Sequence, residues 1–513
     1  MFSFGQLLLG LGTSILLSLA LPWILVFLYT VWARQQGVNG REKLLAELGQ
    51  PPDRRVVGYF HPYCNAGGGG ERVLWTAIVR SQRNEPNVVS VVYSGDIDAS
   101  KEEIIAKVKL RFDIVLDPSS LHFVFLEKRW LVEDATWPAF TLLGQSIGSM
   151  ILTWEAITNV VPHLFIDTMG YAFSFPVVSL IASVPTGAYV HYPTISTQML
   201  KRVTNRQSGV TNRNFISQSI VLTYGKLLYY RIFMFYYSRA LRMASFKMAN
   251  SSWTKNHVDA ILVHRDPLLE FANTFSLARF LFAGPPASAH KQSAQIVYPS
   301  CDTRAMSSFP LTPREPVVLS VAQFRPEKNH AAQLQALAAL LKQHPSTPAK
   351  FVLLGGARND DDLQRVDTLR LLARNLGVED HVEFVVNASY AEVLEWLAKS
   401  SVGLSTMVDE HFGINVVELM AAGVIPVSHA SGGPLHDIIV SFEGKPTGYH
   451  ARTPEEFADA IHIALTLPED EAQEMRQRAR TWAVQAFSED EFERTWNTSG
   501  WRDVLEEGYT QSQ

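Results

Sequence analysis

The sequence predicts an α/β protein with two parallel-sheet domains behind an N-terminal transmembrane helix. Residues 7–32 carry no charge, and from residue 56 onward short apolar strands alternate with helical segments. The alternation starts again after a proline-containing stretch at residues 299–316. Such alternation is typical of parallel sheets covered by helices. A chain of 513 residues is long enough for two such domains.

The composition excludes several classes of protein. Charged residues make up 19% of the chain and hydrophobic residues 47%, which indicates a folded protein. The net charge of -5 argues against nucleic acid as a partner. The two cysteines, Cys64 and Cys301, are far apart and lie in no metal-ligand spacing, so we expect no disulfide framework and no metal site.

The uncharged N-terminal run predicts a membrane anchor within residues 1–33. Its 26 residues, at about 1.5 Å each, are enough to cross a hydrocarbon layer of about 30 Å. The start has no basic residue and the run is long for a cleaved signal peptide. Because Arg34, Arg41 and Lys43 follow it, the rest of the chain is expected in the cytosol.

The first domain is predicted to span residues 34–305. Its expected strands are residues 56–60, 88–93, 114–116, 163–166 and 187–190. A glycine run, Gly67, Gly68, Gly69 and Gly70, stands with Glu71 between the first strand and a helix beginning at Val73. Glycines there let backbone N–H groups approach a phosphate, although a tight structural turn is an equally good interpretation.

The last of these strands is followed by His191-Tyr192-Pro193. A histidine at a strand end can hydrogen-bond a substrate hydroxyl or move a proton. Most single histidines do neither, so the alternative is a purely structural residue.

The second domain is predicted at residues 306–485, with a helical tail at 486–513. Its expected strands are residues 317–321, 351–354, 382–385, 402–404 and 425–427, with helices at 331–343 and 391–399. Two parallel-sheet domains would face a cleft, with ligands at the C-terminal ends of the strands.

The most informative stretch of this domain is Glu410-His-Phe-Gly-Ile-Asn-Val-Val-Glu418. It follows a buried strand and leads into a helix expected from Val416. A helix N-terminus after a glycine loop binds anions, and the two acids could hold hydroxyls beside a bound phosphate. The alternative is one loop acid and one solvated helix acid.

Two cations, Arg325 and Lys328, follow the first strand of this domain. Fixed cations beside a diphosphate stabilise a leaving group without a metal. Two exposed surface charges are the alternative.

The segment between Asp167 and Asp259 contains no Asp or Glu but ten Lys and Arg residues. Its aromatic part predicts a membrane-facing surface at about residues 200–248, because cations and aromatic residues favour anionic lipid. A buried helix with solvated basic ends is the alternative.

Together these motifs resemble the GT-B glycosyltransferases of glycosyltransferase family 4. Within it they are similar to the α-1,2-mannosyltransferases of asparagine-linked glycosylation. The resemblance covers nearly the whole chain. It is carried by the run from His61 to Trp75, Tyr189–Pro193, Tyr298–Thr303 and the Glu410–Glu418 motif.

The resemblance implies a GT-B fold of two Rossmann-like domains and a retaining transfer of mannose from GDP-mannose in α-1,2 linkage. The implied acceptor is dolichol-pyrophosphate-linked Man3GlcNAc2, which gains its fourth and fifth mannoses on the cytosolic face of the endoplasmic reticulum membrane. It implies no metal or other cofactor. ER lipids and other mannosyltransferases of the pathway are the further partners it suggests.

The resemblance also assigns roles to residues. Glu418 would hold the ribose, while Glu410 and the backbone of the next residues would hold the mannose and its phosphate. His191 would contact the donor sugar, Lys328 the diphosphate, and the glycine run with Glu71 the diphosphate and acceptor side. The family's usual arginine is Gln323 here, so Arg325 is the candidate substitute. The remaining expected donor-binding residues are Phe412, Gly413, Ile414, Asn415, Gly432, Gly433 and Asn387.

Two other functions agree with the same motifs. One is a lipid-linked glycosyltransferase that uses a different sugar nucleotide, because no motif separates guanine from uracil. The other is a catalytically inactive, membrane-tethered scaffold, although such a scaffold would not need Glu410, Glu418, Lys328 and the glycine run together.

Overall fold

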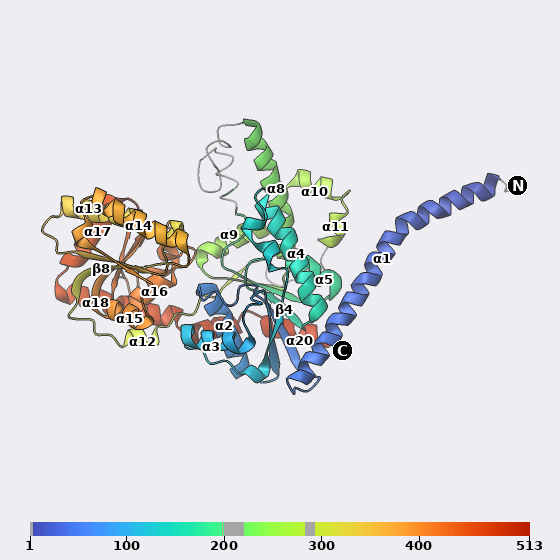
Figure 1. Cartoon of the computed structure of the whole chain (residues 1–513), viewed down its shortest axis with the longest axis horizontal. Coiled ribbons are helices and arrows are strands. Elements are labelled where there is room, and N and C mark those ends of the chain that lie inside the picture. Colours follow the sequence, from blue (N-terminus) through green and yellow to red (C-terminus); the bar gives the residue numbers. More distant parts are fainter. Residues whose placement is uncertain (1–3, 197–198, 200–219, 283–292, 513) are drawn as a thin grey trace. The chain divides into compact units, whose positions relative to one another are not determined.

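The computed structural model describes residues 4–196, 199, 220–282 and 293–512, and the chain forms two units (Figure 1). The first comprises Met1–Lys247, Val258–Ala294 and Ser499–Gln513, and the second comprises Met248–His257 and Gln295–Thr498. We expected two domains that follow each other along the chain, with boundaries at residues 305 and 485. In the structure each unit instead combines segments from separate parts of the chain. The last helix, α20 (Trp501–Ser512), returns to the first unit, where Trp501 is buried and Glu506 pairs with Arg55 at 2.7 Å.

The first sheet has seven strands in the order β3-β2-β1-β4-β5-β6-β7. Strands β1 to β5 pair in parallel, as do β6 and β7. The order reverses between β1 and β4, which is where open α/β sheets bind ligands. The strands are β1 (Arg55–Phe60), β2 (Val88–Ser94), β3 (Leu121–Phe125), β4 (Leu164–Asp167), β5 (Thr186–Val190), β6 (Phe246–Ala249) and β7 (Gln295–Ile296).

The prediction of a strand at residues 114–116 is wrong. The strand that pairs with Ser90–Ser94 is β3, and residues 114–116 connect α3 to it. Asp117 begins a short 3-10 turn by accepting from the Ser119 N–H, so the chain turns before pairing. Apolar residues alone do not separate such a connection from a short strand.

The first unit contains many helices among the residues that the structure describes. They are α1 (Phe4–Glu47), α2 (Gly69–Asn84), α3 (Lys101–Phe112), α4 (Thr141–Asn159), α5 (Ser174–Ile181), α8 (Ile220–Arg242), α10 (Pro267–Asn273), α11 (Ala278–Leu281) and α20, with α9 (Ser252–Leu262) running from one unit into the other.

Helix α1 packs its C-terminal half on α4. Gly37 and Gly40 lie so close that an added Cβ would meet the carbonyl oxygens of Ile157 and Asn159 at 2.1 and 1.8 Å. The ring of Tyr29 stacks on Trp154. Among the residues whose side chains are described, which omit 4–20, 22 and 23, no helix is both long and apolar enough to span a bilayer.

The second sheet has six parallel strands in the order β10-β9-β8-β11-β12-β13. Figure 1 shows α13, α14 and α17 on one side of it and α15, α16 and α18 on the other. Its order reverses between β8 and β11, so the segments after these strands are neighbours.

The expected strands and helices of the second unit are confirmed within a few residues. The strands are β8 (Glu315–Val321), β9 (Lys350–Gly355), β10 (Val382–Val386), β11 (Ser400–Ser405), β12 (Ile425–His429) and β13 (Tyr449–Ala451). The helices are α12 (Arg304–Ser307), α13 (His330–Gln343), α14 (Asp360–Asn375), α15 (Tyr390–Lys399), α16 (Ile414–Ala421), α17 (Pro454–Thr466), α18 (Glu469–Phe487) and α19 (Glu489–Asn497).

Candidate active site

The glycine run of the first unit leads from β1 into the start of α2. Gly67 has φ +80, a left-handed conformation that favours glycine. The Gly68 N–H donates to Glu71 Oε2 at 2.6 Å, and Glu71 is the third residue of the helix. This half of a capping box turns the Glu71 carboxylate back onto its own loop.

A buried histidine that the sequence analysis did not select connects this loop to β4. His61 has no exposed surface, and its Nδ1 lies 2.8 Å from the Thr168 hydroxyl. Its Nε2 lies 3.6 Å from Glu71 Oε1. Burial raises the pKa of Glu71, but contacts with His61 and the Gly68 N–H outweigh it and leave that pKa below its usual value. His61 directly follows β1 and Thr168 directly follows β4, the two strands between which the strand order reverses. A polar residue at the end of a predicted strand was the sequence signal that could have identified both.

The same network brings His191 to the glycine run. His191 Nε2 lies 3.1 Å from the carbonyl oxygen of Thr168, so this nitrogen carries the proton. A Cβ at Gly70 would approach Nε2 to 3.4 Å. The chain thus places the predicted histidine against the predicted glycine run, at van der Waals distance from the Cβ position of Gly70.

In the second unit, Lys328 and Glu410 form an ion pair where β8 and β11 end. Lys328 Nζ lies 2.8 and 3.1 Å from the two Glu410 oxygens, and the side chains are 22% and 12% exposed. Both were expected at the donor. Arg325 instead lies 3.7 Å from Glu327 and is more exposed, and Gln323 accepts the Arg325 N–H through its carbonyl.

Helix α16 starts at Ile414, two residues earlier than predicted. Gly413 has φ +115, and its carbonyl accepts from the N–H groups of Val416 and Val417, which closes the first turn. The first N–H groups of a helix have no intrahelical acceptor, so this start can bind an anion. Glu418 is the fifth residue of α16 and is partly buried.

The glycine turn after β12 packs directly on the Glu410 loop. Added Cβ atoms at Gly432 and Gly433 would lie 2.1 Å from the Glu410 carbonyl oxygen and 2.4 Å from that of Phe412. The Gly433 N–H donates to the Glu410 carbonyl at 2.8 Å. These glycines therefore hold two loops together at backbone distance.

The other expected donor residues have clear local partners. Phe412 is buried against Tyr298 and Phe487, and the Asn415 amide donates to the Val321 carbonyl at 3.2 Å. Asn387 has φ 59, and its side-chain oxygen accepts from the Ala357 N–H at 2.8 Å. The Phe412 ring is thus taken up by core packing, and a role of its backbone in donor binding stays a prediction.

A segment distant in sequence also supports the Glu410 loop, and the sequence analysis missed it. The Ser251 hydroxyl donates to the His411 carbonyl at 2.6 Å, and Trp253 stacks on the His411 ring. Asp437 accepts from the Ser252 N–H at 3.0 Å and from the Tyr298 hydroxyl at 2.9 Å. Burial and nearby Lys328 lower the pKa of His411 to about 4, so its ring is neutral at pH 7.

Within the described residues, no three His, Cys, Asp or Glu side chains come together in a way that could hold a metal ion. The close side-chain contacts at the two loops are those of His61 with Glu71 and of Lys328 with Glu410.

Comparisons with known proteins cover both units of the chain. Residues 54–262 match the family described as ALG11 mannosyltransferase N-terminus, and residues 303–482 match glycosyl transferases group 1. The protein named GDP-Man:Man(3)GlcNAc(2)-PP-Dol alpha-1,2-mannosyltransferase of Mus musculus is 42% identical over 471 residues, covering 90% of each chain. Its namesake in Dictyostelium discoideum is 44% identical, covering 85% of this chain and 82% of its own.

Solved structures share the fold at low identity. The N-terminal domain of Candida albicans trehalose-6-phosphate phosphatase matches 88% of this chain and 96% of its own at TM-score 0.59 and 11% identity. Sucrose-phosphate synthase from Thermosynechococcus elongatus matches 88% of this chain and 100% of its own at TM-score 0.55 and 16% identity. The two parallel sheets and these neighbours agree with the expected GT-B α/β fold. The chain belongs to the family of GDP-Man:Man(3)GlcNAc(2)-PP-Dol alpha-1,2-mannosyltransferases.

Proposed function

We propose that this protein transfers mannose from GDP-mannose, in α-1,2 linkage, onto dolichol-pyrophosphate-linked Man3GlcNAc2, and adds the fourth and fifth mannoses. The observation that carries the proposal is the Lys328–Glu410 pair beside the start of α16, within a chain 42% identical to a protein of that name. The second unit would bind the donor, and the first the acceptor.

In this proposal Lys328 exchanges its contact with Glu410 for the departing diphosphate. The exchange frees the Glu410 carboxylate for mannose hydroxyls, and the N–H groups at the start of α16 add positive potential near the phosphate. Glu418, one turn into the helix, accepts hydrogen bonds from the ribose. Positioned charges of this kind stabilise a leaving group more strongly than water does, because they need no reorganisation.

We further propose that transfer retains the anomeric configuration through a front-face, oxocarbenium-like state without a metal ion. His191 is held by the Thr168 carbonyl beside Gly70 and would contact the donor sugar. Its role would be to orient the sugar rather than to attack it, since its Nε2 proton is committed to that carbonyl.

The membrane part of the proposal places α1 as a single-pass anchor in the endoplasmic reticulum, with the catalytic units in the cytosol. The uncharged residues 7–32 and the following Arg34, Arg41 and Lys43 support it. The membrane-facing surface expected at about 200–248 falls partly on residues 200–219, outside the described residues. In α8, Tyr224 and Leu228 are exposed, which supports the remainder. Other mannosyltransferases of the pathway stay a suggestion for partners.

The test is transfer by the detergent-solubilised protein from GDP-mannose to a trimannosyl lipid-pyrophosphate acceptor. Product longer by two mannoses is expected. Transfer only from UDP-sugars would indicate a different donor. Thermal stabilisation by neither GDP nor UDP would favour the inactive scaffold, since a ligand at 100 times its Kd adds about 2.7 kcal/mol to the free energy of unfolding.

A further inference from the structure

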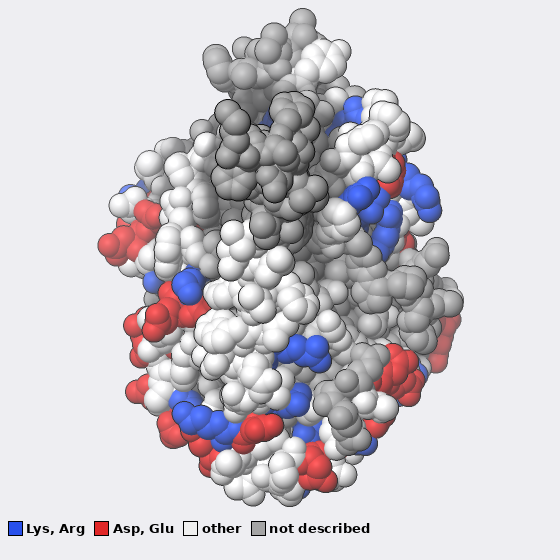
Figure 2. All heavy atoms as spheres, turned by 90° about the vertical axis from the view of Figure 1, so that its right-hand side faces the viewer, with Lys and Arg blue, Asp and Glu red and all other residues white. Residues whose placement is uncertain are grey.

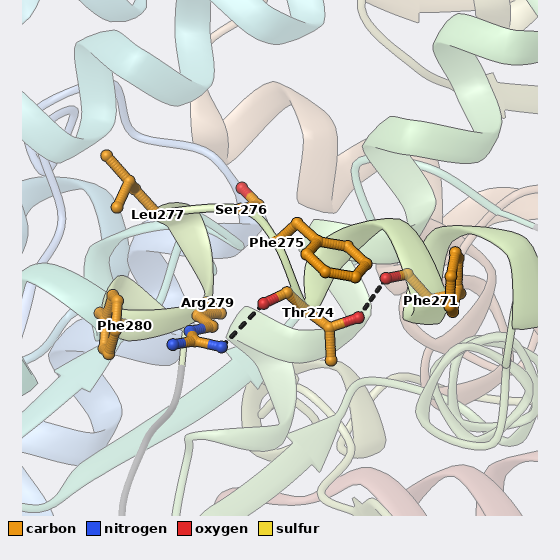
Figure 3. Close-up of a pocket in the computed structure, with 7 residues that line it drawn as sticks. All are labelled: Phe271, Thr274, Phe275, Ser276, Leu277, Arg279 and Phe280. Atoms are coloured by element: carbon orange, nitrogen blue, oxygen red, sulfur yellow. Dashed lines mark hydrogen bonds between the residues drawn. The ribbon is translucent and has the colours of Figure 1, made fainter.

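Residues 266–282 hold five large apolar side chains outward. We call Leu268, Phe271, Phe275, Leu277 and Phe280 the phenylalanine cluster, and they are 58% to 79% exposed. They lie on α10, on α11 and on the turn between these helices, and Figure 3 draws all of them except Leu268. Monomeric soluble proteins rarely expose so many adjacent large apolar side chains without a binding role.

The polar side of the same segment is fixed to α8, which is why the apolar side points away. Asp266 forms a bidentate pair with Arg231 at 2.9 and 3.1 Å, and Glu270 pairs with Arg239. Asn273 accepts from the Tyr236 hydroxyl at 3.3 Å. Asp266 and Asn273 are both buried.

Polar contacts also fix the turn between α10 and α11. The Thr274 carbonyl accepts from the Arg279 guanidinium at 2.7 Å, and this guanidinium lies 4.6 Å from the centre of the Phe280 ring (Figure 3). The cluster therefore has a defined shape that its own polar contacts maintain.

The ion pairs change the expected role of α8. Arg231 and Arg239 were among the cations expected to meet anionic lipid, but both neutralise acids of α10. Arg231 and Arg239 are therefore not free to attract anionic lipid, because each is paired with an acid. The exposed face of this segment is apolar instead. Such a surface binds by apolar burial, which depends little on salt.

Other helices of the first unit also carry exposed apolar side chains. Helix α5 contacts α1, α8 and α11. In α1 the apolar side chains of Ile24, Leu25, Phe27 and Trp32 are about half exposed, as is Leu228 of α8. In Figure 2, among the spheres of the described residues, Asp and Glu lie mostly toward the margin of the view, while white spheres with a few Lys and Arg lie nearer its middle.

We propose that the phenylalanine cluster inserts among the acyl chains of a lipid bilayer and forms a membrane contact separate from α1. Arg279 would stay at the headgroup level while its apolar stem lies along Phe280, as long basic side chains do at membrane interfaces. The proposal rests on the proposed function in one respect: a lipid-linked acceptor requires the first unit to stay at the bilayer surface.

The test uses the full chain with one environment-sensitive fluorophore. Both native cysteines are buried, so Phe275→Cys can be labelled selectively, and Leu110→Cys, 89% exposed on α3, is the matched control. In phosphatidylcholine vesicles containing doxyl-labelled lipid, the label at 275 is expected to shift to the blue and to lose at least half its emission, in 1 M salt as well. The label at 110 should keep its emission.

Equal emission at the two positions would overturn the proposal. So would a blue shift at 275 that appears without vesicles and grows with protein concentration, because that would assign the cluster to contact between two copies of the chain.

An activity comparison separates this proposal from the proposed function. The triple variant Phe271→Ser, Phe275→Ser and Phe280→Ser is expected to lose about tenfold in transfer to a vesicle-embedded acceptor, yet to stay within twofold on a short-chain acceptor in detergent. Leu110→Ser should change neither. Equal loss on both acceptors would contradict lipid insertion. A native protein that transfers mannose to neither acceptor would refute the proposed function, and the quenching result would still decide the insertion.

Discussion

The two glycine-rich loops look alike in sequence but use their acids in opposite ways. In the first unit Glu71 is the third residue of α2, so its carboxylate reaches back to the Gly68 N–H and faces buried His61. In the second unit Glu410 precedes the helix and Glu418 is its fifth residue, so neither can form that cap. Glu410 pairs with the cation Lys328.

The difference shows that the position of an acid relative to the helix start decides its role. An acid at the third helical position accepts a hydrogen bond from a backbone N–H of the loop before the helix, and this bond fixes the shape of the loop. Glu410, which precedes its helix, instead pairs with Lys328, a residue of another loop. Substitutions in the first loop should therefore act mainly through shape, and those in the second mainly through charge.

The largest effect is expected for Lys328→Met. Loss of the cation beside the leaving diphosphate should lower kcat by about 100- to 1000-fold, the range seen for removal of one preorganised stabilising donor. The control is Lys350→Met, which removes the exposed Lys350–Glu383 pair of the same unit. Steady-state kinetics with GDP-mannose measure both, and equal values for the two variants would contradict the charge role.

Glu418→Gln should raise the donor KM by about 10- to 100-fold with a smaller change in kcat. A hydrogen bond to a charged group contributes about 1.5–3 kcal/mol, and the amide keeps the shape of the side chain. An unchanged KM would remove Glu418 from the ribose site.

In the first loop, His61→Leu should reduce the free energy of unfolding by about 1–3 kcal/mol, because Glu71 loses its buried partner. Adding Glu71→Gln should recover part of that loss, since the amide needs no counter-charge. Urea unfolding of both single variants and the double variant gives the coupling energy, expected at about 0.5–3 kcal/mol for residues in contact. Additive losses would show that the two side chains do not interact.

Gly70→Ala should lower kcat by about threefold to tenfold with little change in Tm. Its Cβ would stand 3.4 Å from His191 Nε2, at the near edge of van der Waals contact, and would restrict the positions open to the ring during the reaction. Gly225→Ala in α8 is the control, because a Cβ there meets nothing within 4 Å. Equal kcat values for the two alanine variants would show that the position of the His191 ring does not affect the reaction.

The smallest effect is a pH dependence at β4. Burial raises the pKa of Asp167 to about 7, although the N–H groups of Met169 and Gly170 oppose the shift. The folded pKa lies above the unfolded value of about 3.9, so the contribution of Asp167 to stability is full below pH 4 and is lost as pH rises through 7. Asp167→Asn should flatten the decline of Tm between pH 5 and 8. Parallel Tm curves for the two proteins would contradict the shift.

The sequence alone determined much of this protein, because its signals are local. Hydrophobic runs located most strands, and glycines with acids at strand ends located the Glu410–Glu418 loop, Lys328 and the glycine run. It failed at residues 114–116, where an apolar stretch connects elements without pairing.

Only the tertiary structure decided which partner each charged side chain takes. His61 and Thr168 meet because β1 and β4 are neighbours in the sheet, although 107 positions separate them. Arg231 and Arg239 pair with acids that lie 35 and 31 positions later, so these two cations of the expected basic surface are neutralised by the fold. Residue type and local spacing record the periodicity of strands and helices, whereas ion pairs and buried hydrogen bonds depend on chain segments that only the fold brings together.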